Sequence, residues 1–218
     1  ALGDWAPGEP SPWHPAMPER DHGPHVGLIG RRTEQAHIAL AVPGVSLHHP
    51  DREAVGMLST ALGEGMSSRL FLEVRERRGL AYDVHAYVSH YLDAGTLNVY
   101  AGVDPKRLDE AIGAIVGELN RVSDDGVTED ELRKVRELLK GRLLLRMEDT
   151  RAVSAWLGGQ ELLLGRIRSI DEAVAEIEAV TARDVQRVAR DLLRPDAFHL
   201  AVVGPYRSEE RIARTLRN

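Results

Sequence analysis

Two residues with hydrogen-bonding side chains, Arg75 and Tyr82, lie on either side of a single glycine, Gly79. Before the glycine, Leu70 and Val74 recur at helical spacing, and after it apolar and polar residues alternate as in a β-strand. Arg75 and Tyr82 therefore flank one tight corner, where a guanidinium and a phenol can direct hydrogen-bond donors to a common point. The alternative is a helix-terminal arginine that complements the helix dipole and a half-buried strand tyrosine.

The segment around this corner contains its own start and stop signals. Ser67 is expected to cap the helix, and Gly79 suits the left-handed conformation that ends it. After Gly79, the period of two places Tyr82 on the same side of the strand as Val84 and Ala86. The helix ends with three cations in its last turn: Arg75, Arg77 and Arg78.

A short glycine loop, with Gly63, Gly65, Ser67 and Ser68, leads into this helix. A glycine-rich loop at a helix N-terminus can hold a phosphate group. This loop lacks the lysine and the spacing of a P-loop and does not follow a strand, and Glu64 would repel an anion. The sequence therefore does not favour a phosphate site here.

Metal-binding patterns are absent from the sequence. Neither H-x-x-E-H nor H-E-x-x-H occurs, although both are typical of zinc peptidases. The nearest cluster, His48-His49-Pro50-Asp51, precedes a helix, and adjacent histidines do not converge easily on one ion. His85 and His90 fall on opposite faces of one strand. His37 and His199 stand at strand starts. We expect no metal site in this chain.

The elements needed to hold the corner predict an α+β fold, a mainly antiparallel sheet with helices largely on one face. The expected strands are 37–42, 82–90, 95–103 and 199–203, with the second and third paired. The expected helices are 50–62, 105 to 119 or 122, 128–147, 152–164 with an interruption near Gly158-Gly159, two that open at Ser169 and Thr181, and a last one through Arg214. On helix 128–147 the residues expected on the buried face are Leu132, Val135, Leu139 and Leu143, and those expected to be exposed are Arg133, Arg136 and Lys140.

Composition limits the class of protein. The chain has 218 residues, a net charge of −6 and no cysteine. The absence of cysteine excludes disulfides and thiolate metal sites. The negative net charge does not favour nucleic-acid binding, which needs a clustered basic face. No apolar run is long enough for a membrane span. No signal peptide is visible at the start, and the expected location is cytoplasmic.

The segment from Gly63 to Tyr82 resembles a signature of the pitrilysin, insulinase and mitochondrial processing peptidase family of zinc metallopeptidases. The residues that carry the resemblance are Gly63, Gly65, Met66, Ser68, Arg69, Leu70, Glu73, Arg75, Glu76, Arg78, Gly79, Leu80, Ala81 and Tyr82. In that family the motif lies in the second of two similar halves, which holds substrate and lacks the zinc. The resemblance implies that Arg75 and Tyr82 bind the substrate carbonyl.

The resemblance also suggests roles for the rest of the chain. In the non-catalytic subunit of mitochondrial processing peptidase a longer glycine-rich loop contributes to substrate handling, which implies a substrate role for Gly63, Gly65, Ser67 and Ser68. Residues 1–25 contain six of the eleven prolines and are expected to form an extended linker. Residues 26–218 are expected to form a single substrate-binding domain.

The function implied by the resemblance is that of one half of a zinc metalloendopeptidase. The zinc and the H-x-x-E-H motif would belong to a partner half, on the same polypeptide or on a separate subunit, and this chain alone would be inactive. Its other partners would be a peptide substrate and, in a dimer, a like or unlike subunit. The alternative is a structural subunit of the same fold, like the core subunits of the respiratory cytochrome complex, which assembles without cleaving peptides.

Overall fold

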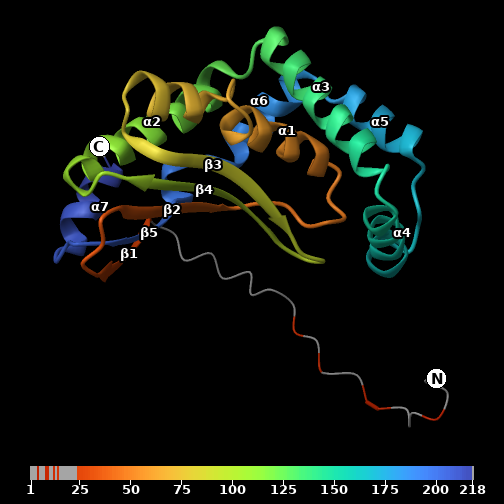
Figure 1. Ribbon diagram of the computed structural model, residues 1–218, viewed down its shortest axis with the longest axis horizontal. Coiled ribbons are helices and arrows are strands. Elements are labelled where there is room, and N and C mark those ends of the chain that lie inside the picture. The colour runs from red at the N-terminus through yellow and green to blue at the C-terminus, as the bar shows by residue number, and fades with distance from the viewer. Residues whose placement is uncertain (1–3, 5–7, 10–11, 13, 15–23, 218) are drawn as a thin grey trace.

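The computed structural model describes residues 4, 8–9, 12, 14 and 24–217. Within this part of the chain, a five-stranded mixed sheet carries helices on one face (Figure 1). The strands are β1 (His25–Gly30), β2 (Ala36–Pro43), β3 (Ala81–His90), β4 (Gly95–Val103) and β5 (His199–Gly204). The helices are α1 (Arg52–Gly63), η1 (Phe71–Arg77), η2 (Pro105–Arg107), α2 (Leu108–Asp125), α3 (Glu129–Arg146), α4 (Thr150–Leu164), α5 (Ile170–Ala179), α6 (Ala182–Leu192), η3 (Pro195–Ala197) and α7 (Glu209–Arg217).

The strand order in the sheet is β1-β5-β2-β4-β3. Only β1 and β5 run parallel, and the other neighbouring strands pair antiparallel, including the expected β3–β4 hairpin. The α+β class and the mainly antiparallel sheet predicted from the sequence are therefore confirmed.

The covered face of the sheet forms the core. Ile38 and Leu40 of β2 alternate with the more exposed Ala39, as expected for a strand with one buried side. Helices α1, α2 and α6 pack over this face and against one another, and α7 lies beside α2 and β1 (Figure 1). Burial of apolar side chains between the sheet and this helix layer stabilises the domain.

The predicted starts of helices α3, α5 and α6 are confirmed. Thr128, Ser169 and Thr181 each accept a hydrogen bond from the backbone N–H three residues ahead, and the acidic residue at that position accepts in return from the cap backbone. These reciprocal pairs satisfy backbone donors that the first helical turn leaves free. Each of these three helices therefore begins with a capping box at the predicted start.

Two other sequence predictions are wrong, and a third is not tested. Strand β1 was not expected, and it forms because His25–Gly30 pairs with β5 from the far end of the sequence. Helix α4 continues without a break through Gly158 and Gly159. The proposed linker 1–25 lies mostly outside the described residues.

The predicted apolar stripe of α3 is only half right. Leu132 and Val135 are buried, whereas Leu139 and Leu143 are partly exposed because the helix runs past the edge of the sheet and its C-terminal half has less to pack against. Arg136 and Lys140, expected to be exposed, are partly covered by α5 and the turn after it. Arg136 donates to the Val180 carbonyl, and Lys140 lies 3.1 Å from Glu178.

Candidate functional site

The corner between η1 and β3 is built from an unusually wide helical turn. The backbone N–H of Arg78 donates to the Glu73 carbonyl, five residues back, and that of Leu80 donates to the Val74 carbonyl, six residues back. Residues Phe71–Arg77 therefore form a π-helix, a rare geometry that is frequent at functional sites. Gly79 ends the turn at a φ of 56°, where a glycine was expected.

Arg75 lies on the solvent side of this turn. Its guanidinium carbon is 5.0 Å from the centroid of the Phe71 ring and 6.0 Å from that of Tyr82, so the cation rests beside two aromatic rings. Among the described residues no carboxylate forms an ion pair with Arg75. Its charge is thus positioned but not neutralised.

Tyr82 is exposed because β3 begins with a bulge. Ala81 pairs with Val103 and Asp83 pairs with Gly102, which leaves Tyr82 as the extra residue between them. The expected alternation, with Tyr82 on the Val84 side, is therefore wrong: the side chain is 76% exposed. Bulges redirect side chains in this way and are enriched next to active sites.

The neighbouring arginines are held by a buried carboxylate. Glu73 accepts from Arg78 Nε at 2.8 Å and from Arg77 Nη1 at 3.1 Å. The hydrogen bond from Arg78 is the main reason why the pKa of Glu73 lies below its ordinary value, and Arg77 contributes to the same shift. Glu73 thus pairs with the two cations beside Arg75 and leaves Arg75 without a carboxylate partner among the described residues.

The turn before α2 holds the backbone of the corner, and α2 itself carries a buried carboxylate whose charge acts on Glu73 and Arg77. Arg107 Nη1 donates to the carbonyls of Arg78 and Gly79, at 3.1 and 3.3 Å, and Arg107 is itself paired with Glu110. Glu118 of α2 is buried and lies 2.7 Å from Arg121, and burial raises the pKa of its carboxyl group. The backbone of the corner is therefore restrained independently of the Arg75 and Tyr82 side chains.

Sequence reasoning missed Phe71 and Glu73 as parts of this site. Both had a signal in the sequence, because Phe71 precedes Arg75 by four residues, as Glu73 precedes Arg77, and side chains at this spacing meet on a helix. Arg107 had no such signal, since its contact with the corner is tertiary.

The four predicted loop residues have separate environments. Gly63 is buried against β3, where a Cβ would lie 2.1 Å from the Ala86 nitrogen, and Ser68 is buried with its Oγ donating to the Gly65 carbonyl at 2.8 Å. Gly65, at a φ of 85°, and Ser67 are exposed. Ser67 was expected to cap the helix, but no described side chain caps η1. The neighbouring Ser68 uses its hydroxyl to donate to the Gly65 carbonyl within the loop.

The loop lines a cavity that Arg75 and Tyr82 do not share. This cavity, of about 500 Å³, lies between the loop, α1 and α3, and is lined by residues such as Met66, Leu72 and Val135. The structure brings Arg75 and Tyr82 together, but it does not place them with the predicted loop in one pocket.

The histidines that the structure describes do not form a metal site. No group of three or more metal-ligating side chains converges within the described part of the chain. His49 Nδ1 accepts from the Asp51 backbone, His37 Nδ1 lies 2.8 Å from the Tyr100 hydroxyl, and His90 Nδ1 lies 2.8 Å from the Val45 carbonyl. These residues do not fit a catalytic zinc ion, which needs at least three converging protein ligands.

Comparison with known proteins gives a consistent family. Residues 1–139 match the family model described as the peptidase M16 inactive domain. The chain is 45% identical over 187 residues to an uncharacterized zinc protease of Streptomyces coelicolor, covering 85% of this chain and 40% of that protein. It is 31% identical over 195 residues to a probable mitochondrial-processing peptidase subunit beta of Arabidopsis thaliana, covering 84% and 36%.

Solved structures show the same fold. A protease from Helicobacter pylori superimposes with a TM-score of 0.80 at 22% identity, covering 92% of this chain and 48% of that one. Complex III2 from Candida albicans contains a chain that superimposes with a TM-score of 0.75 at 20% identity, covering 89% and 49%. The chain spans less than half the length of these relatives. None of the helices in its described residues has the length and apolar character to span a membrane.

Proposed function

Because the chain belongs to the family of peptidase M16 inactive domains, we propose that it is the substrate-binding half of a zinc metalloendopeptidase. Its role is to complete the catalytic chamber opposite a zinc-binding half, carried by the same polypeptide or by a second subunit. The names of its relatives support a zinc protease, and the absence of a fitting ligand set in the described residues is consistent with a zinc ion held elsewhere in the assembly.

The observation that carries the proposal is the unpaired, exposed couple of Arg75 and Tyr82. Arg75 has no carboxylate partner among the described residues, because Glu73 binds Arg77 and Arg78. Tyr82 is turned toward solvent by the bulge, and no acceptor for its hydroxyl is present among the residues that the structure describes. A folded domain that leaves two adjacent donors unsatisfied has them available for a ligand.

The chemistry of the couple suits a peptide carbonyl. The guanidinium and the phenol can both donate hydrogen bonds. Donors held in place beside a carbonyl oxygen stabilise the negative charge that develops there during hydrolysis. Arg75 adds a full charge to this interaction, and the Phe71 ring restricts where that charge lies.

The structural-subunit function remains the second candidate, because the chain from Candida albicans complex III2 has the same fold. Fold does not distinguish the two functions. The test is therefore made on the Arg75 and Tyr82 side chains, in the full-length protein that contains this domain.

The variants Arg75→Ala and Tyr82→Phe should lower kcat/KM for peptide cleavage without changing zinc content or thermal stability. Loss of the Tyr82 hydroxyl should reduce kcat/KM on the order of 10²-fold, as for other single donors to an oxyanion. Loss of Arg75 should reduce it at least as much, because the donor is charged.

Two matched controls separate this effect from a general loss of charge or hydroxyl groups. Arg183→Ala removes an exposed cation from α6, away from the corner, and Tyr87→Phe removes an exposed hydroxyl from the same strand as Tyr82. Both should retain activity. If Arg75→Ala and Tyr82→Phe also retain it, or if they lose activity only in proportion to a fall in melting temperature, the structural-subunit function is favoured.

A further inference from the structure

Helix α4 stands apart from the rest of the domain. Of its fifteen residues only Gln160 is buried, and none of its apolar side chains belongs to the hydrophobic core or packs against its margin. Figure 1 shows α4 beyond the end of the sheet, away from the helices that cover the sheet face. We use the name α4 arm for residues 144–167, which comprise the end of α3, α4 and the turn that follows.

The α4 arm exposes a cluster of large apolar side chains. Leu162 is 84% exposed, and five others are more than a third exposed: Leu144, Leu145, Leu157, Leu163 and Ile167. A helix of this length is marginally stable without tertiary packing, and each glycine in it costs about 1 kcal/mol relative to alanine. The sequence of α4 is therefore suited to packing that the described residues do not supply.

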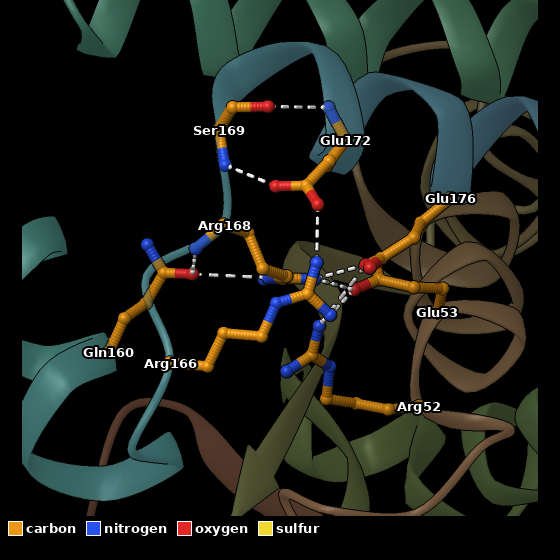
Figure 2. A network of polar contacts seen from close by, with 8 residues as sticks. All are labelled: Arg52, Glu53, Gln160, Arg166, Arg168, Ser169, Glu172 and Glu176. Atoms are coloured by element: carbon orange, nitrogen blue, oxygen red, sulfur yellow. Dashed lines mark hydrogen bonds and ion pairs between the residues drawn. The ribbon is translucent and has the colours of Figure 1, made fainter.

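A polar network holds the base of the arm in a fixed place (Figure 2). Arg168, whose side chain is only 16% exposed, donates to the side-chain oxygen Oε1 of Gln160 from its backbone N–H at 3.2 Å and from Nε at 3.1 Å. It also pairs with Glu53 of α1 at 3.4 Å and with Glu176 of α5. The arm is thus presented in a defined orientation, which reduces the entropy lost when a partner binds.

The surface of the arm also allows close approach. A Cβ added at Gly158 or at Gly159 would meet no atom within 4 Å, so a partner backbone has room beside this glycine pair. The charged residues of the arm are of both signs, with Arg146, Arg151 and Arg166 beside Glu148, Asp149 and Glu161. Helices that lie on anionic membranes are instead rich in basic residues, so a protein surface is the better match.

We propose that the α4 arm is the docking surface for the remaining half of the longer polypeptide found in the relatives. The chain aligns over 85% of its own length with only 40% of the S. coelicolor relative, so a protein of that size carries a further part large enough to cover the arm. The proposal rests on the proposed function only in taking that part to be the zinc-binding half. The partner surface must be apolar and must lack a strong net charge.

The test compares hydrogen exchange of residues 150–164 in the isolated 218-residue chain and in the full-length protein. Exchange at these amides should be slower in the full-length protein by roughly tenfold or more, because the partner stops the helix from opening. The variant Leu162→Glu should abolish that difference while leaving the melting temperature of the isolated chain unchanged, since Leu162 is already exposed there.

The control variant Leu92→Glu places the same carboxylate at an exposed leucine outside the arm and should change neither protein. Equal exchange of α4 in both proteins would overturn the proposal. So would protection in the isolated chain that grows with its concentration, which would make a second copy the occupant. Because the readout is exchange and not cleavage, α4 can be protected in a full-length protein that cleaves no peptide, which would refute the proposed function alone.

Discussion

Among the described residues, Arg75 has no carboxylate partner because its neighbours Arg77 and Arg78 both bind the buried carboxylate of Glu73. Glu73 can accept several hydrogen bonds, and Arg77 and Arg78 occupy it from two directions. Since all three arginines belong to one turn, their separate fates depend on the π-helical geometry of the backbone. At the scale of single residues, the candidate site thus depends on Arg75 being the arginine of this turn that does not pair with Glu73.

Gly63 shows how a residue of the signature can be required for packing rather than for binding. Replacing Gly63 by alanine would put a Cβ 2.1 Å from the Ala86 nitrogen and 2.6 Å from its Cβ, so α1 and β3 must separate. We expect the free energy of unfolding to fall by roughly 1–3 kcal/mol, the range for overpacked sites. Urea denaturation of this chain measures the change.

The matched control for this variant lies in the same helix. Gly56 has no atom within 4 Å of an added Cβ, so Gly56→Ala should raise the free energy of unfolding by about 0.5–1 kcal/mol through helix propensity alone. If both variants stabilise the protein, the close contact between α1 and β3 is wrong. If Gly63→Ala instead leaves stability intact and raises KM in the full-length enzyme, Gly63 belongs to the substrate loop.

At the scale of elements, the sequence predicted what local signals decide and missed what distant partners decide. The starts of α3, α5 and α6 and the β3–β4 hairpin depend on residues close in sequence, and they were predicted correctly. Strand β1 contains two glycines in six residues, and its pairing with β5 is a long-range contact that no local pattern reveals. The bulge at Tyr82 has the same origin, because it is defined by the register against β4.

The apolar stripe of α3 should show a gradient of stability along the helix. Leu132→Ala should lower the free energy of unfolding by about 2–5 kcal/mol, since Leu132 is buried in the core. Leu139→Ala should lower the free energy of unfolding by less than Leu132→Ala does. Leu145→Ala should change the free energy of unfolding of the isolated chain by less than about 0.5 kcal/mol, as for exposed residues in general. Equal losses at all three positions would show that the end of α3 is buried in solution.

At the scale of the whole molecule, one face of the sheet and the α4 arm are both left open by the described residues (Figure 1). The domain therefore has a well-packed hydrophobic core, but parts of its apolar surface remain exposed. Relatives about twice as long, or longer, supply the material that could cover these regions. In the proposed function, Arg75 and Tyr82 donate hydrogen bonds to a substrate, and the group that attacks the substrate belongs to the zinc-binding half.

This incompleteness predicts the behaviour of the isolated chain toward metal. Purified alone, it should retain only substoichiometric zinc and should cleave no peptide, because its described histidines and carboxylates do not converge. Chelation should leave its melting temperature unchanged. A domain whose folding depended on a structural zinc ion would instead be destabilised by a chelator. Elemental analysis and a peptide-cleavage assay measure this directly, and stoichiometric zinc with activity would contradict the domain assignment.

The position of β5 between β1 and β2 has a consequence for synthesis on the ribosome. His25 pairs with His199 and His37 with Val203, so two early strands are joined only by one of the last segments to be translated. Until β5 has been translated, β1 and β2 are not joined in the sheet. The edge of β2 that pairs with β5 stays without its hydrogen-bond partner. Closure of such a long loop is entropically unfavourable and slows folding. The domain is therefore expected to reach its native sheet after translation of nearly the whole segment, and any polypeptide that precedes it has time to fold first.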